Sequence, residues 1–331
     1  MVHLVLVAEF SHLVLPASEP GLPEFEASCL TGQEADAHLW LTEGGQTTGR
    51  CSLWWQKTPS LEGLPLGYIG HYAASDEASG QALLERACAC LQERGCRRAV
   101  GPMDGNTWRR YRFVTDRGIE PPFFMEPQNP ASWPLHWTAC GFTPLAEYYS
   151  ALNTGLSKID PRIARTESRL RESGITIRPL RADQFLEELR RVYAVSAISF
   201  QSNYLYTPLE EADFIAQYRQ IEKRIDPRLV LLAEREGEPV GYIFAIPDLA
   251  QAQRGEAIDT VIIKTVAVLP GRAQAGLGAV LLEKIHHTAH ALGYKRAIHA
   301  LMHETNKSRN LSDHSARTMR RYTLFAKRLG S

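Results

Sequence analysis

One stretch of the chain, residues 259–282, constrains the fold more than any other. It reads DTVIIKTVAVLPGRAQAGLGAVLL. An apolar run rich in β-branched residues ends at Pro270, a loop with three glycines follows, and leucines then recur at helical spacing. The pattern predicts a strand, a glycine-rich loop and a helix in direct succession.

The loop has the features of an anion site. Gly276 and Gly278 carry no side chain that would keep a ligand from the backbone, and the first turn of a helix offers N–H groups without intrahelical acceptors. Phosphate or pyrophosphate suits such a turn. A P-loop would need Gly-Lys-Ser/Thr, where this chain continues with Ala279 and Val280. A dinucleotide fingerprint would need a third glycine, although Glu304 lies only slightly beyond the place of its acidic residue.

A third motif fits better. The succession V-x-P, short loop, G-x-G and leucine-rich helix resembles motif A of the GNAT (GCN5-related) N-acyltransferase superfamily, whose loop Arg/Gln-x-x-Gly-x-Gly/Ala holds the pyrophosphate of acyl-coenzyme A (acyl-CoA). Ala273 stands here in the place of the Arg/Gln, between Arg272 and Gln274. The resemblance implies that the loop and the backbone of the preceding strand bind acetyl-CoA or another acyl-CoA as co-substrate. The implied cofactor-binding residues are Val266, Ala267, Val268, Arg272, Ala273, Gln274, Ala275, Gly276, Leu277, Gly278 and Ala279, followed by Asn306 and Arg309.

The second part of the chain, residues 175–331, has its elements in the order of a complete GNAT domain. Patterns predict strands at 175–180, 229–234, 239–246 and 296–303, one helix capped by Asp183, another opened by the capping box 207–210, and a last helix from Asn306. The basic tail from Glu304 to Ser331 is expected mainly to supply a solvated helix face.

The first part, residues 1–154, repeats the order strand, helix, strand between Tyr68 and Val100, without the glycine loop. We therefore predict an α/β (α+β) protein with tandem GNAT folds, each a mixed central sheet flanked by helices. The N-terminal copy, 1–154, is expected to be degenerate, 155–174 to form a linker helix, and 175–331 to bind acyl-CoA. The resemblance is to a bacterial two-domain group of the superfamily.

Irregular, proline-rich segments at 101–114 and 121–130 are dense in aromatic and charged side chains. Loops of this composition build binding pockets. Our candidates for the acceptor site are Trp108, Tyr111, Phe124 and Glu126. The alternative is that the aromatic residues seal an interface between the two parts, and the two interpretations are compatible because clefts often lie at domain interfaces.

The reaction that the resemblance implies is attack of an amine on a thioester, which needs a base, an N–H group for the oxyanion and an acid for the thiolate. The simplest case is transfer of acetyl to an amine of a small molecule or peptide. Tyr322, which resembles a tyrosine common near the end of GNAT chains, is the candidate acid. Asp259, Glu304, His303 and Glu126 are candidate bases, and a chain of water molecules is the alternative to any of them.

Charge and composition exclude several other classes. The 37 basic and 37 acidic residues leave no net field, so we expect neither nucleic acid nor a membrane as partner. The six cysteines lie in the first half without a C-x-x-C pair, and no apolar run is long enough to span a membrane, so we expect free thiols in a cytoplasmic protein. His286 and His290 lie four apart on a helix, but they lack the H-E-x-x-H pattern and an evident third ligand, so we expect no metal.

Two alternatives to an acetyltransferase remain open. One is a non-catalytic acyl-CoA sensor, because the Arg/Gln position is altered and no base is unambiguous. The other is a Fem-type aminoacyl transferase. The intact glycine loop and the neutral net charge are both arguments against it. The sequence does not identify the acceptor, the acyl chain length or the oligomeric state.

Overall fold

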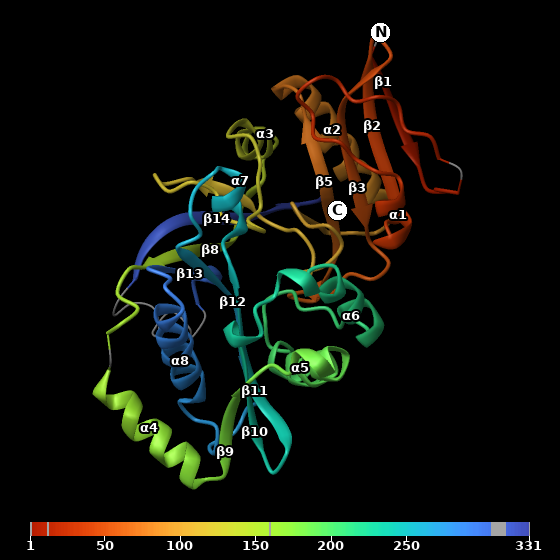
Figure 1. Cartoon of the computed structure of the whole chain (residues 1–331). Helices are drawn as coiled ribbons and strands as arrows, with labels where there is room; N and C mark the ends of the chain where they lie inside the picture. The colour runs from red at the N-terminus through yellow and green to blue at the C-terminus, as the bar shows by residue number, and fades with distance from the viewer. Residues whose placement is uncertain (1, 12, 159, 306–315, 331) are drawn as a thin grey trace.

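The computed structural model describes residues 2–11, 13–158, 160–305 and 316–330 (Figure 1). These residues form a mixed sheet of fourteen strands with helices on its faces. The strands are β1 Val2–Val7, β2 Ala37–Glu43, β3 Gln46–Trp54, β4 Ser60–Leu61, β5 Leu64–Ala74, β6 Arg98–Gly101, β7 Phe113–Asp116, β8 Thr143–Asn153, β9 Ile175–Pro179, β10 Val230–Arg235, β11 Glu238–Pro247, β12 Thr260–Val268, β13 Arg296–His303 and β14 Ala316–Arg328. The α-helices are α1 Ser28–Gly32, α2 Glu77–Glu93, α3 Ser132–Ala139, α4 Pro161–Glu172, α5 Phe185–Ser199, α6 Glu211–Arg219, α7 Leu249–Gln253 and α8 Leu277–Ala291.

The strand order joins the two parts of the chain into one sheet. Twelve strands follow one another as β1-β2-β3-β5-β6-β14-β8-β13-β12-β11-β10-β9, while β4 and β7 pair with β5 and β14. β14, the last strand of the chain, lies between β6 and β8, and β8, the last strand of the first part, lies between β14 and β13. Each part therefore gives its final strand to the other, and the antiparallel pair β8 and β14 forms the seam between them.

Helix α2 covers one face of the first part. It begins where the sequence predicts, because the Asp76 side chain accepts a hydrogen bond of 2.7 Å from the N–H of Ser79. Leu83 and Leu84 of the helix are fully buried in one core with Cys51 of β3 and Ile69 of β5. Full burial of an aliphatic side chain stabilises the fold by about 2 kcal/mol, so this face is held mainly by apolar packing.

Helices cover both faces of the second part (Figure 1). On one face Leu281 and Ile285 of α8 pack with Val261 and Ile263 of β12, and α4 lies on the outer side of α8. On the other face α5 and α6 pack over Ile262, which alternates with these residues along the strand. The strand is thus buried on both sides, which explains why its sequence is an almost continuous apolar run.

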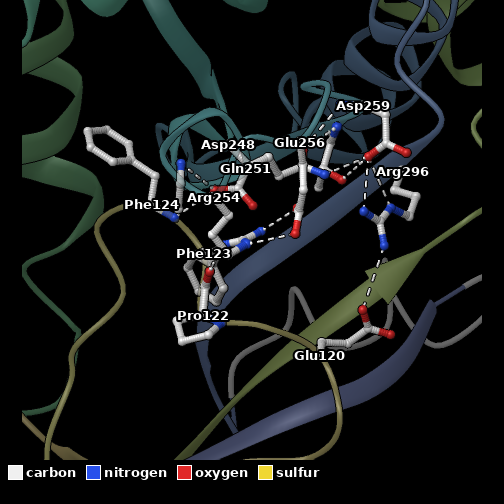
Figure 2. A network of polar contacts seen from close by, with 12 residues as sticks. Glu120, Pro122, Phe123, Phe124, Asp248, Gln251, Arg254, Glu256, Asp259 and Arg296 are labelled. Atoms are coloured by element: carbon white, nitrogen blue, oxygen red, sulfur yellow. Dashed lines mark hydrogen bonds and ion pairs between the residues drawn. The ribbon is translucent and has the colours of Figure 1, made fainter.

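A loop of the first part docks on the second part (Figure 2). The N–H of Phe124 donates to Asp248 Oδ1 at 2.8 Å, and Arg254 donates to the carbonyl oxygen of Pro122 at 2.8 Å. Arg296 contacts Glu120 at 3.6 Å and also pairs with Asp259 at 3.0 Å. These contacts fix residues 120–124 against α7 and the start of β12.

The structure corrects three local predictions. Asp183 does not cap a helix; it lies in a single 3₁₀ turn, and α5 begins after it without a side-chain cap. The prediction that a capping box at 207–210 opens a helix is also wrong. Helix α6 begins at Glu211, and its N-cap residue makes no side-chain hydrogen bond. Residues 316–328, expected in the last helix, form β14. The predicted start of that helix, Asn306, lies outside the described residues.

Two expectations about the whole chain can be compared with the structure. All six cysteines are free, and all but Cys29 are buried. Within the ranges given above, the structure contains no helix with the length and apolar composition needed to cross a membrane.

Candidate functional site

The two central strands of the second part diverge halfway along their length. β12 and β13 pair in parallel only from Thr260 opposite Arg296 to Ile263 opposite His299. Beyond that point β12 stays with β11, whereas β13 stays with β8. Where β12 approaches the glycine loop, the facing edges of the two strands are therefore not hydrogen-bonded to each other.

A β-bulge marks the point of divergence. Thr265 lies opposite Phe244 and Ile263 lies opposite Ala245, so Lys264 is the extra residue with no partner in β11. The N–H of Leu269 donates to Val240 of β11 at 2.9 Å. Because backbone groups alternate between the two edges of a strand, those of Val266 and Val268 face the β13 side. The backbone groups of these two residues are among those predicted to pair with the pantetheine arm, and that pairing stays a prediction.

The glycine loop leads directly into α8. Gly276 is the N-cap residue, with φ of 82°, and a Cβ placed there would lie 2.7 Å from Cγ2 of Thr166 in α4. Both facts require glycine. The backbone N–H groups of Gly276 and Gly278 find no acceptor in the part of the chain that the structure describes. They are available to an anion at the positive end of the helix dipole.

Helix α4 brings a cation to this loop that sequence reasoning missed. The Arg169 guanidinium donates to the carbonyl oxygen of Ala275 and lies 3.9 Å from the Cβ position of Gly276. The motif departs from the family at Ala273, where Arg or Gln is usual, and Arg272 is exposed. Arg169 therefore places a positive charge beside the loop from a helix that the sequence predicts only as a linker.

Lys264 is the second residue that sequence reasoning missed. Burial, and then the charge of the neighbouring Arg112 guanidinium, lower the pKa of its ammonium group to about 8, although the Glu126 carboxylate acts in the opposite direction. An amine with a pKa near neutrality is suited to accept a proton. Its signal in the sequence is that it is the one charged residue in the apolar run TVIIKTVAV.

His303, a candidate base, lies at the end of β13. Its Nδ1 accepts a hydrogen bond of 3.1 Å from the N–H of Thr305, so the neutral ring carries its proton on Nε2. Nε2 is buried and has no partner among the residues described. Burial, and then the charge of Arg112, lower the pKa of this histidine. The ring is thus a hydrogen-bond donor rather than a base in this arrangement.

Glu126 and Tyr322 come together in a buried network. The Tyr322 hydroxyl donates to Glu126 and accepts from Ser150 at 2.9 Å, and Ser150 in turn accepts from the N–H of Leu301 in β13 at 3.1 Å. Arg320 pairs with Glu126 at 2.5 Å. Burial raises the pKa of the tyrosine strongly and that of the glutamic acid as well, although Tyr322 and Arg320 act against the latter shift.

This network decides what Tyr322 can do. Its side chain is fully buried and its hydroxyl is occupied on both sides. A leaving thiolate would need direct access to that proton. The geometry places Tyr322 in the seam between β8 and β14, and its role as the acid stays a prediction.

The other candidate bases lie apart from the bulge. Asp259, just before the opposite end of β12, is surrounded by Gln251, Thr260 and Arg296. Burial alone would raise its pKa, but hydrogen bonds from these three residues hold it at about 2, which makes the carboxylate a weak base. Glu304 follows β13 and pairs with Arg321 at 2.7 Å.

Three predicted acceptor residues are partly buried, and two of them, Trp108 and Phe124, pack between the two parts of the chain. Trp108 donates its indole N–H to the carbonyl oxygen of Thr207 at 2.9 Å and contacts Phe214 edge to face. Phe124 packs against the same core. Tyr111 lies edge to face with Tyr148, and the Arg112 guanidinium stacks on both rings. The aromatic residues therefore seal an interface, and a role in acceptor binding stays a prediction.

The histidines considered as metal ligands are arranged differently. His286 Nε2 lies 3.0 Å from His299 Nε2, and the two rings stack. Burial is the largest cause of the lowered pKa of both rings, which is about 4 for His286 and about 3 for His299. Apart from residues 1, 12, 159, 306–315 and 331, the structure contains no group of three metal-binding side chains. Asn306 and Arg309, predicted to bind the cofactor, lie outside the described residues.

Comparisons with known proteins agree with this geometry. Residues 189–313 match the model of the acetyltransferase (GNAT) family. A bacterial ceramide synthase of Caulobacter vibrioides is 26% identical over 222 residues, a match that covers 66% of this chain and only 58% of that protein.

Solved structures show the same fold. The GCN5-related glucosamine N-acetyltransferase region of a fungal multi-domain β-N-acetylglucosaminidase has a TM-score of 0.54 at 13% identity, over 93% of this chain and 35% of that one. A tandem GNAT protein from the clavulanic acid biosynthesis pathway has a TM-score of 0.50 at 11% identity, over 100% of this chain and 99% of that one. The predicted tandem α/β architecture is confirmed.

Proposed function

The chain contains a domain of the acetyltransferase (GNAT) family, and from this premise we propose that it is an N-acyltransferase that moves an acyl group from acyl-CoA to an amine. One observation carries the proposal. β12 and β13 diverge at a bulge, beside a glycine loop whose free N–H groups lie at the N-terminus of α8. A pyrophosphate on the loop and a pantetheine arm along β12 would bring the thioester to the bulge.

The residues at the bulge supply the chemistry of the transfer. Lys264 in its neutral form removes a proton from the acceptor ammonium, and the amine nitrogen then attacks the thioester carbonyl carbon. The N–H of Val266 stabilises the oxyanion, because it faces the β13 side of the strand. The C–S bond breaks, the departing thiolate takes the remaining surplus proton of the amine nitrogen to leave as the CoA thiol, and the Nε2–H of His303 donates a hydrogen bond to the sulfur.

Two acceptor classes are worth separating. Acetyl transfer to a small amine or peptide is the simplest reading of the family. The name of the Caulobacter relative favours a second candidate, since a ceramide is the amide of a long-chain amine and a fatty acid. Apolar, partly buried side chains such as Leu269 and Leu301 flank the diverging strands and suit such a substrate.

The test is release of free CoA by the purified full chain. Acetyl-CoA and palmitoyl-CoA are each offered with spermidine, with an amino-acid amide and with sphinganine in mixed micelles. Turnover with acetyl-CoA and a small amine supports the first class, and turnover that requires both long-chain partners supports the second. If acyl-CoA raises the melting temperature but no amine gives turnover, the chain is a sensor and the enzyme proposal fails.

A variant of the loop locates the donor site in the same assay. Gly276→Glu places a carboxylate where the pyrophosphate is expected and should abolish the response to acyl-CoA. Gly276→Ala is the matched control, because it brings the same Cβ contact with Thr166 at the same positive φ, 82°, but no carboxylate. Equal loss in both variants would show that strain at Gly276, rather than the carboxylate, is being measured.

A further inference from the structure

A cavity of about 100 Å³ lies in the first part of the chain. Arg50, Arg110, Arg112, His71 and Asp104 are among the residues that line it. The neighbours of Arg50 in β3 pack under α2, so alternation along the strand turns Arg50 to the opposite face of the sheet. The cavity lies where β5 leaves β6, since their parallel pairing ends at Tyr68 opposite Val100.

Arg50 is a buried cation without a counter-ion. Only 5% of the residue is exposed. Its Nη2 donates to the carbonyl oxygen of Pro23 at 2.5 Å, but Nε and Nη1 have no hydrogen-bond partner within the described part of the chain. It forms no ion pair with a described residue. A buried charge with unsatisfied N–H groups is strongly unfavourable unless something else pairs with it.

The surroundings add positive charge rather than cancel it. Arg112 is 6% exposed, and its Nε is also without a described partner. Arg110 is near enough for its charge, after burial, to help lower the pKa of Arg50 to about 10. One lining acid, Asp104, is already engaged, because it accepts the N–H of His71 at 2.6 Å. The other lining acid, Glu24, is exposed.

The charge balance indicates the class of ligand. Three arginines and two acids leave the cavity with about one net positive charge, which suits a monoanion better than a phosphate dianion. The cavity reaches solvent beside Glu24 and Arg110, which are both exposed. A void of this volume accepts one end of a small molecule but not a nucleotide.

We propose that this cavity binds the carboxylate group of a small organic molecule, with the buried Arg50 guanidinium as its counter-ion. Carboxylate oxygens accept charge-assisted hydrogen bonds from guanidinium N–H groups, and such bonds are about twice as strong as neutral ones. The site is separate from the glycine loop. It lies on the face of the sheet opposite α2, whereas the loop belongs to the far part of the chain.

The experiment measures binding without acyl-CoA, so it does not depend on the proposed enzyme activity. Melting temperature and titration calorimetry are recorded for the full chain with sodium acetate, propionate, succinate or inorganic phosphate, each against sodium chloride of equal ionic strength. A carboxylate at about a hundredfold excess over its Kd should raise the melting temperature by about 3 °C.

Three variants make the result specific. Arg50→Met should melt no lower than the wild type in chloride, because it removes an unpaired buried charge, and it should lose the response to carboxylate. Arg50→Lys keeps the charge without the planar fork and should bind at least about tenfold more weakly. Arg97→Met, at an exposed position outside the lining of the cavity, should respond like the wild type.

Several outcomes would overturn the proposal. One is that no carboxylate shifts the wild type beyond the chloride control. Another is that Arg50→Met keeps the full shift, which would place the anion elsewhere. A larger effect of inorganic phosphate than of every carboxylate would refute the assigned class of ligand.

Discussion

Lys264 and Arg50 illustrate, at the scale of single residues, how a charge inside a largely buried strand indicates function. Each interrupts a strand whose neighbours are buried, and neither has an ion-pair partner in the described structure. The sequence alone carries this signal for Lys264, which is the one charged residue in TVIIKTVAV, whereas Arg50 stands in the mixed run QTTGRCSLW and its burial emerges only from the fold. What surrounds the charge is set by tertiary contacts: Arg112, from a distant loop, lies beside both.

Replacing Lys264 by Met should lower kcat by about a hundredfold or more, the usual effect of losing a general base. The wild-type rate should rise with pH through about 8, because the lysine must lose its proton to act, and the variant should lack this rise. The initial rate of CoA release between pH 6 and 10 checks this. Lys295→Met, at an exposed position, is the control. An unchanged pH profile in Lys264→Met would rule out the lysine as base.

Arg169→Gln should raise KM for acyl-CoA about tenfold and leave kcat nearly unchanged. The guanidinium lies beside the glycine loop, far from the bonds that break, and loss of one charged hydrogen bond costs about 1.5 kcal/mol. Arg165→Gln on the same helix, exposed and without a described contact to the loop, is the matched control. Equal KM values for the two variants would remove Arg169 from the donor site.

At the scale of elements, the regular parts of the fold follow from local patterns. The strands β10, β11, β12 and β13 and the helices α2 and α8 fall where apolar periodicity and turn residues predict them. β14 was missed because its basic residues suggest a solvated helix, whereas Arg320 is buried by its pairing with Glu126. That partner comes from a loop 194 residues earlier in the chain, and no local pattern contains such information.

This pairing makes β14 sensitive to one substitution. Arg320→Met should lower the free energy of unfolding by about 3–5 kcal/mol, because it leaves the Glu126 carboxylate buried without a counter-charge. The double variant with Glu126→Gln should recover much of the loss. Urea unfolding measures both. Arg317→Met in the same strand is the control: its side chain is 54% exposed, so its pair with Glu120 should contribute less than about 1 kcal/mol. Equal losses would contradict the burial argument.

For the same reason, only part of the candidate site could be predicted from the sequence. The glycine loop and the strand before it are contiguous in sequence, and the structure places them as a local pattern requires. Tyr322 and Asp259 were assigned by position in the chain, but their environments depend on which distant side chains surround them. The burial of Tyr322 and the ion pairing of Asp259 both depend on tertiary contacts.

At the scale of the whole molecule, the exchange of β8 and β14 joins the two parts into one sheet. We expect a single calorimetric unfolding transition, since neither part of the chain has a complete set of strands without one from the other. Residues 1–154 and 175–331 expressed separately should be insoluble or unfolded, and co-expression should recover soluble complex. Two separate transitions, or a fragment that folds alone with a cooperative melt, would contradict this expectation.

The same exchange bears on how the protein is made. A ribosome synthesises β6 more than 200 residues before the strand that must lie beside it in the finished sheet. Until residues 316–328 leave the exit tunnel, the nascent chain holds an open strand edge at its centre, and open edges recruit other chains. Residues 316–328 therefore close the sheet, so a product that ends before them should aggregate rather than fold as one functional half.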